Sequence, residues 1–311
     1  MNNEELLHAL GNLLLNKNKS ISLDLAYENY INQAKVKCRK ETVIYYEKKW
    51  AVLKPILKDL NFHYTSDLTK TNYNTIINIL ISKNYCNATI NKYCDLLKSI
   101  LKINVELDYI PYSPLANIKK LKETIPEVKT ITQENIEKIF NYMFNQPKTF
   151  LNVRDTLGIL IMNDTGVRAN ELVNIKVKNI NIQKNTIYLD FTKTHEPRYV
   201  FIQDKTIEWL NMYMKFHNGN EYLFLTLEGK QLQRDSMYHK LEKIKKELKI
   251  SQSITPHKWR HTFATNLIKN NVNLNTIMKV MGHTQYSTTQ RYLHQETDEL
   301  KNQVLEVLKK S

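Results

Sequence analysis

The chain has 311 residues, 42% of them hydrophobic and 10% aromatic, and its lysines and arginines exceed its acidic residues by 14 charges. The length exceeds one usual compact core and predicts two domains, while the apolar content excludes a largely disordered chain. The positive charge suits a polyphosphate partner such as nucleic acid, although a generically basic proteome would give the same value.

Neither a membrane span nor a cysteine-based site is indicated. No run approaches the roughly 18 apolar residues that cross a bilayer, and the first residues lack the layout of a signal peptide. We therefore expect a cytoplasmic protein with no membrane partner. Cys38, Cys86 and Cys94 form no CxxC pair, so we expect buried thiols and no disulfide framework or zinc site.

The first part of the chain, residues 21–110, is predicted to be a small helical domain. Apolar residues recur there at helical spacing and no segment alternates like a strand, which indicates four or five helices. Thr42, Thr69 and Asn87 are the expected caps near helix starts. Residues 1–20 would be a helical extension, because residues 4–15 place leucines on one face.

A linker is predicted over residues 111–130, where prolines flank a basic run. Its marked residues are Pro111, Pro114, Pro126, Lys119, Lys120 and Lys122. A second domain, 131–311, would begin at Ile131, with Thr132 as the helix cap and Glu134 in the first turn.

The second domain combines helices with a small antiparallel hairpin. Thr186 to Asp190 and Arg198 to Ile202 have strand character and are joined by a turn, and helical patterns lie on both sides. The fold class is therefore mainly α with a small antiparallel β-hairpin or sheet, and the second domain is α+β. Residues 297–310 form another predicted amphipathic helix.

Cleaving a phosphodiester without a metal needs cationic donors around the phosphate, an aligned nucleophile and an acid for the leaving oxygen. The second domain contains such residue types, although each alone has a simpler interpretation. An Arg after Thr-Gly can pair with a nearby Glu, and a Lys in a turn is usually a solvated charge. Their conjunction in one domain favours chemistry: Thr165-Gly166-Val167-Arg168-Ala169-Asn170-Glu171, Lys193, His257-Lys258-Trp259-Arg260, Gly282-His283 and Arg291-Tyr292.

This order of motifs resembles the tyrosine recombinase or phage integrase family, and its Xer-type members in particular. The resemblance covers residues 131 to about 294 motif by motif, and more loosely the helical part before it, which is similar to the family's core-binding domain. It implies that the two domains form a clamp around DNA and that residues 297–310 are an exchange helix. The family's catalytic signature corresponds to Arg168, Lys193, His257, Arg260, His283 and Tyr292.

The resemblance also implies a role for each residue. Tyr292 would be the nucleophile that becomes joined to a DNA phosphate, Arg168 and Arg260 would hold the non-bridging oxygens, and His283 would add a hydrogen bond. Lys193 would protonate the leaving oxygen, and His257 would assist Tyr292 or orient the phosphate. Glu171 would orient the basic groups. No metal and no other cofactor is implied.

Some motifs depart from the family's usual residues. Trp259 stands where Leu is common, and Asn170 replaces the common Ser. The hairpin contains Thr-Lys-Thr-His instead of a glycine-rich turn, which makes His195 a neighbour of the expected acid Lys193.

Residues other than the catalytic ones are also expected to bind DNA. A helix is predicted over 231–250, and its start is suited to entering the major groove, so Gln233 and Arg234 are candidate base readers. A solvated charged face would produce the same pattern. The remaining candidates would bind backbone phosphates: Lys40, Lys119, Lys120 and Lys240.

The predicted function is that of a site-specific recombinase or integrase, acting through a 3′-phosphotyrosyl intermediate and a Holliday junction without metal or ATP. Its expected partner is double-stranded DNA with paired inverted half-sites. We expect a homo-tetramer on synapsed DNA, a monomer or weak dimer when free, and association with the nucleoid. About twenty residues precede the helical domain, too few for the arm-binding domain of larger phage integrases. The alternatives are a type IB topoisomerase and a non-catalytic DNA-binding regulator.

Overall fold

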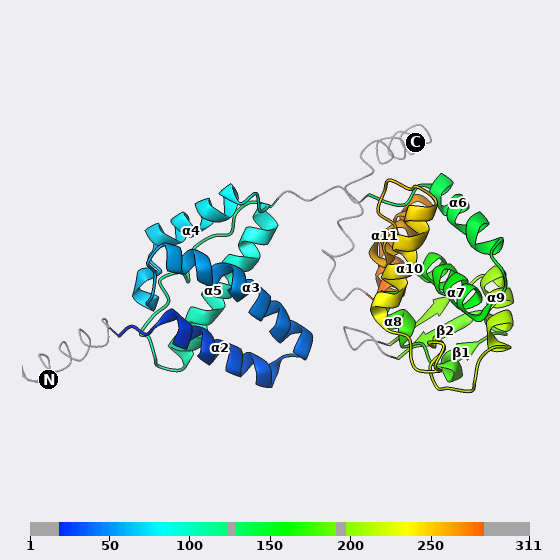
Figure 1. The fold of residues 1–311 in the computed structure, drawn as a ribbon, viewed down its shortest axis with the longest axis horizontal. Coiled ribbons are helices and arrows are strands. Elements are labelled where there is room, and N and C mark those ends of the chain that lie inside the picture. Colours follow the sequence, from blue (N-terminus) through cyan, green and yellow to red (C-terminus); the bar gives the residue numbers. More distant parts are fainter. Residues whose placement is uncertain (1–18, 124–128, 191–196, 283–311) are drawn as a thin grey trace, which may run out of the picture. The chain divides into compact units, whose positions relative to one another are not determined.

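The computed structural model describes residues 19–123, 129–190 and 197–282 (Figure 1). The chain divides into two compact units, Met1–Ile125 and Pro126–Ser311. Helices predominate in both units, and one small antiparallel sheet lies in the second. This arrangement confirms the predicted fold class. In the part of the chain that is described, no helix is long and apolar enough to span a membrane.

The first unit is a helical domain built around its last described helix, residues 87–106. Its helices are α2 (Leu23–Lys37), α3 (Lys40–Asp59), α4 (Lys70–Ser82) and α5 (Asn87–Glu106), with a short 3₁₀ turn at Thr65–Asp67 (Figure 1). The apolar face of α5 packs against the other three helices, and Leu97, Ile100 and Leu101 are almost fully buried there. Asn104 is also buried and donates to the carbonyl oxygens of Ala26 and Ile100, so its amide does not remain unsatisfied.

The helix starts test three predicted caps. The Thr69 side chain accepts from the backbone N–H of Asn72, which confirms it as the cap of α4. The prediction for Thr42 was wrong, because α3 begins earlier, at Lys40. The prediction for Asn87 was also wrong, because Asn87 is the first residue of α5 and Cys86 occupies the capping position. The expectation of three buried thiols was also wrong, since Cys86 at that position is exposed.

Much of the predicted linker lies against the first unit. Leu115 is fully buried in that unit's core. Asn91 donates to the Leu121 carbonyl at 2.9 Å and accepts from the Leu121 N–H at 2.9 Å. The chain up to Glu123 therefore contributes to the helical domain.

The second unit is built around one central helix, α7 (Phe150–Thr165). Every residue from 157 to 162 is buried, so the middle of α7 is enclosed on all sides, and Ile159, Ile161 and Met162 are fully buried. The capping prediction for Thr132 is confirmed at the start of α6. The unit's other elements are α6 (Gln133–Phe144), α8 (Ala169–Val173), a 3₁₀ turn (Val177–Asn179), β1 (Ile180–Asn181), β2 (Thr186–Leu189), β3 (Arg198–Phe201), α9 (Asp204–Met214), α10 (Arg234–Glu247), α11 (Pro256–Lys269) and α12 (Leu274–Met281).

The sheet has the antiparallel order β1-β2-β3. Its register pairs Ile187 with Val200 and Leu189 with Arg198, which confirms the predicted hairpin. Along β3 the side chains alternate, so that Arg198 and Val200 are buried while Tyr199 and Phe201 are exposed. An arginine therefore lies on the buried face of the sheet.

Candidate active site

Arg168 is placed by a sharp turn after α7. Gly166 ends the helix with φ +59°, a left-handed conformation that favours glycine. A β-carbon at this position would lie 2.5 Å from the Phe263 ring, so the close approach of α11 also requires glycine. Val167 is then buried, and Arg168 takes up extended backbone as the cap residue of α8. The Thr-Gly-Val-Arg motif thus directs one arginine out of the core.

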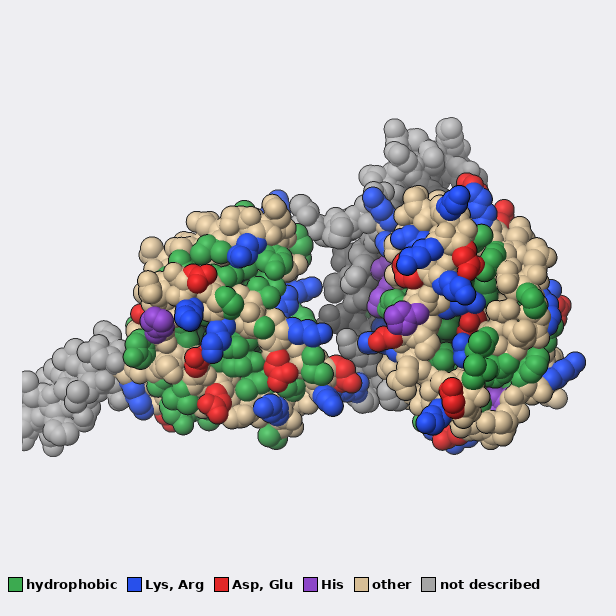
Figure 2. All heavy atoms as spheres, in the orientation of Figure 1, with side chains coloured by type: hydrophobic (Ala, Val, Ile, Leu, Met, Phe, Trp, Pro, Cys, Tyr) green, Lys and Arg blue, Asp and Glu red, His purple; other side chains and the backbone are tan. Residues whose placement is uncertain are grey.

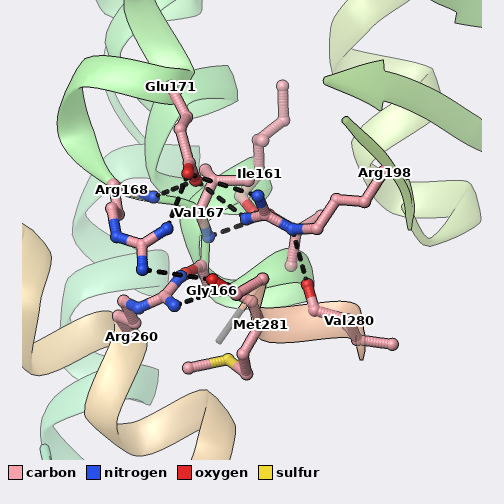
Figure 3. A network of polar contacts seen from close by, with 11 residues as sticks. Ile161, Gly166, Val167, Arg168, Glu171, Arg198, Arg260, Val280 and Met281 are labelled. Atoms are coloured by element: carbon pink, nitrogen blue, oxygen red, sulfur yellow. Dashed lines mark hydrogen bonds and ion pairs between the residues drawn. The ribbon is translucent and has the colours of Figure 1, made fainter. Parts of the chain in front are cut away.

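Glu171 lies between two arginines (Figure 3). Arg168 donates to its carboxylate from the backbone N–H at 3.0 Å and from Nη1 at 2.8 Å. From the other side, Nη1 and Nη2 of Arg198 donate to the two carboxylate oxygens at 3.2 and 2.8 Å. Glu171 is only 2% exposed, so these bonds replace its hydration.

The carboxylate remains ionised in spite of its burial. Burial by itself raises the pKa of Glu171, but the hydrogen bonds and charges of Arg198 and then Arg168 lower that pKa to about 2. Two guanidinium groups and one carboxylate leave this cluster with one net positive charge at neutral pH.

Arg260 reaches the same place from α11. It is 5% exposed, and it donates from Nη1 to the Gly166 carbonyl at 2.7 Å and from Nη2 to the Met281 carbonyl at 2.5 Å. Arg260 therefore joins the turn before Arg168 to the end of α12 (Figure 3).

Three arginines bind consecutive carbonyl groups at the end of α12. Arg198 Nε donates to Val280 at 2.8 Å, Arg260 to Met281, and Arg168 Nη2 to Gly282 through a long 3.5 Å bond. Carbonyl groups at a helix C-terminus lack intrahelical partners and carry partial negative charge, so cations are favourable there. The structure thus brings the predicted Arg168, Glu171 and Arg260 together at the residue before His283.

The other expected catalytic residues are only partly covered. His257 is exposed in the first turn of α11, three residues before Arg260 and thus on a neighbouring helical position. Lys193, His283 and Tyr292 lie outside the described residues, as do His195 and the predicted exchange helix 297–310.

The candidate base readers lie at the start of α10. Gln233 is its cap residue and Arg234 its first residue, and both are exposed. Figure 2 shows lysine and arginine side chains over the second unit with acidic side chains among them. Lys240, further along α10, is only 17% exposed and pairs with the buried Asp155 at 3.3 Å.

The candidate phosphate-binding lysines of the first unit differ in their surroundings. Lys40 is exposed at the start of α3, and Lys119 is exposed after the last helix. Lys120 forms a 2.7 Å ion pair with Asp95, which raises the pKa of the lysine mainly through the hydrogen bond between them. These DNA contacts stay predictions.

The sequence predicted no role in the site for Arg198, which was recognised only as the arginine that the family resemblance expects five residues after Lys193. Its side chain lies on the same buried face of β3 as that of Val200. A charged residue at an apolar position of a strand must have a partner, so the alternation itself was a signal. The partner, Glu171, is 27 residues away and could not be read from the strand.

Comparisons with known proteins identify the family of the chain. Residues 129–299, more than half of the chain, match the Phage integrase family. The chain is 34% identical over 212 residues to "Tyrosine recombinase XerA" of Saccharolobus solfataricus, covering 68% of this chain and 67% of the relative. It is 26% identical over 225 residues to "Tyrosine recombinase XerD" of Staphylococcus aureus, covering 69% and 74%. The protein belongs to the phage integrase family of tyrosine recombinases. Its enzymatic class is therefore that of the tyrosine-type site-specific DNA recombinases.

Solved structures share the fold. A Tn1549 transposon integrase in complex with a circular intermediate DNA has a TM-score of 0.72 at 18% identity, covering 86% of this chain and 94% of the other. A lambda integrase dimer bound to a core site has a TM-score of 0.72 at 17% identity, covering 90% and 79%. The comparisons do not favour a type IB topoisomerase or a non-catalytic regulator.

Proposed function

We propose that this recombinase cuts DNA by forming a 3′-phosphotyrosyl link to Tyr292 and exchanges strands through a Holliday junction, without metal or ATP. The observation that carries the proposal is the convergence of Arg168 and Arg260 on the end of α12, immediately before His283. Forked guanidinium donors match the non-bridging oxygens of a phosphate, and fixed donors stabilise the charge that develops there during attack.

The contacts of the two arginines support roles that need a fixed orientation. Glu171 holds Arg168 through its backbone and its side chain, and two carbonyl groups hold Arg260. Because these donors are oriented before DNA binds, little reorganisation is required during the reaction. The charge left on the cluster attracts the phosphate.

The remaining roles concern proton transfer. A tyrosine has an ordinary pKa near 10, so nearby cations are needed to favour the phenolate of Tyr292. In the proposal His257 assists this deprotonation or orients the phosphate, His283 donates to the phosphate, and Lys193 protonates the leaving 5′ oxygen.

The proposed partner is duplex DNA with paired inverted half-sites, held in a clamp by both units. Lys40, Lys119 and Lys120 would bind phosphates from the helical domain, and Gln233 and Arg234 would enter the major groove. A homo-tetramer would form on synapsed DNA, with residues 297–310 docking into a neighbouring subunit. The free protein would be a monomer or weak dimer in the nucleoid-containing cytoplasm.

The test is covalent trapping. Binding sites are first selected from a random-sequence library with the Tyr292→Phe protein. The selected duplexes are then synthesised with a nick at successive positions. The nick lets the short fragment released by cleavage diffuse away, so that the covalent adduct accumulates. The unchanged protein should form an adduct that survives denaturing electrophoresis, also in excess EDTA, and Tyr292→Phe should form none while binding within a few fold. The matched control Tyr286→Phe should still form it. An adduct formed by Tyr292→Phe, or lost in EDTA, would contradict the proposal.

A further inference from the structure

Arg198 is a charged side chain at a buried position of β3, where an apolar residue would be expected. It is 8% exposed and lies beside Val200 on the inner face of β3. Burying a guanidinium costs several kcal/mol unless its donors are bonded. Its donors reach both oxygens of Glu171 and the carbonyl of Val280, so the arginine connects β3 to α8 and to the end of α12.

The negative charge of Glu171 affects how strongly Arg168 can attract a phosphate. Arg168 donates twice to the same carboxylate, so the two residues alone would form a neutral pair. A neutral pair would attract a DNA phosphate far less than a free cation does, because the carboxylate repels the phosphate as the guanidinium attracts it. The bidentate pairing of Arg198 with Glu171 restores one positive charge to the group.

The end of α12 is built closely around the same side chain. A β-carbon at Gly282 would lie 2.8 Å from Nη1 of Arg198, and Gly282 has φ +62°. Close approach and left-handed backbone both favour glycine at this position. Arg198 thus fixes the chain at the residue that precedes His283.

We infer that Arg198 is a positioning residue of the cleavage reaction, which neutralises Glu171 and so leaves the charge of Arg168 for the DNA phosphate. The inference rests on the proposed function. It predicts an unusual dependence between two residues: once Arg198 has lost its charge, removing the charge of Glu171 should help cleavage. A purely mechanical clip predicts the opposite, because each further loss of a bond weakens the clip.

The experiment compares Arg198→Met, Glu171→Gln, the double variant and the unchanged protein. The single-turnover rate of adduct formation is measured on the nicked duplex at saturating protein, and DNA affinity and melting temperature are measured separately. Arg198→Met should cleave about tenfold to a hundredfold more slowly, below the loss of a full oxyanion donor. The double variant should cleave at least about fivefold faster than Arg198→Met, since a charge effect of about 1 kcal/mol corresponds to about a fivefold change in rate.

A matched control is Arg154, which belongs to another buried ion pair of the same unit. It binds Asp155 at 2.7 Å, and the two side chains are 11% and 8% exposed. Arg154 lies on α7, about three turns before Thr165. Arg154→Met should lower the melting temperature while leaving the cleavage rate within about twofold at temperatures where the protein is folded.

A variant that keeps the charge tests the inference if Arg198→Met does not fold. Arg198→Lys retains the cation but cannot make the bidentate bond together with the bond to Val280. Its cleavage rate should stay within about fivefold of the unchanged protein. The role of Arg198 would be overturned if the double variant cleaved no faster than Arg198→Met. It would also be overturned if Arg198→Lys cleaved more than about tenfold more slowly than the unchanged protein. Absence of any adduct with the unchanged protein would overturn the proposed function as well.

Discussion

Replacing Glu171 by Gln should destabilise the second unit in a pH-dependent way. The change keeps the size of the side chain and removes its charge. Since Arg198 and Arg168 lower the pKa of Glu171 from 4.5 to about 2, the folded state favours the charged form by about 3 kcal/mol, at about 1.4 kcal/mol for each pH unit. This stabilisation is present above pH 4.5 and is lost as the pH falls towards 2. Between pH 7 and pH 3 the difference between the two proteins should shrink by about 2 kcal/mol.

The assay is urea unfolding of both proteins at a series of pH values. The chain has two compact units, and two units need not unfold in a single transition, so the probe must report on the second unit alone. Trp50 is in the first unit, where its ring stacks on Tyr27 at 4.4 Å, whereas Trp209 and Trp259 are buried in the second. In a Trp50→Phe background, tryptophan fluorescence follows only the second unit.

The direction of the pH dependence is what tests the reasoning. If the difference in unfolding free energy between the two proteins stays constant from pH 7 to pH 3, or grows as the pH falls, the contribution of Glu171 to stability does not depend on its charge. The slope of the unfolding free energy against urea should be equal for the two proteins, which checks that the compared transitions are the same.

Three further outcomes are expected. Gly166→Ala should lower the unfolding free energy of the second unit by at least about 2 kcal/mol in the same urea assay, because the left-handed backbone and the Phe263 ring both oppose a β-carbon; a loss below about 0.5 kcal/mol would contradict this. Lys193→Ala should cleave slowly and recover on DNA with a 5′-bridging phosphorothiolate, whose sulfur leaves without a proton; no recovery would place the acid elsewhere, with His195 tested next. Deletion from Asp298 onward should leave a monomer that binds one half-site without cooperativity; retained cooperativity with a large fall in melting temperature would refute docking of 297–310 into a neighbour.

Local patterns predicted most of the described fold. Four helices follow from apolar spacing in the first unit, and the hairpin follows from alternation in β2 and β3, because each burial pattern repeats over several residues. β1 was missed, since a strand of two residues, Ile180–Asn181, has no period to detect. Thr42 was misplaced as a cap because α3 begins at Lys40 without a capping side-chain bond.

The site was predicted to a lesser depth. The spacing of Arg168 and Glu171 alone allows their ion pair, which is found at 2.8 Å. The meeting of Arg168 with Gly282 joins residues 114 positions apart, and no local pattern encodes it. Only the resemblance to a family placed Arg260 near Arg168. The role of Arg198 could be inferred only from the structure, since its partners lie on two other elements.

The arginine contacts at the end of α12 also bear on the order in which the enzyme matures during synthesis. Arg168, Arg198 and Arg260 reach carbonyl groups that follow them in the chain by 114, 82 and 21 residues. Contacts between distant residues close large loops and tend to form late in folding. A nascent chain whose residues 280–282 have not yet left the ribosome lacks these three contacts, so Glu171 and Gly166 would hold its arginines without the end of α12. An unfinished polypeptide is expected to attract DNA by charge before it can cut, so strand breakage would begin only when this unit is complete.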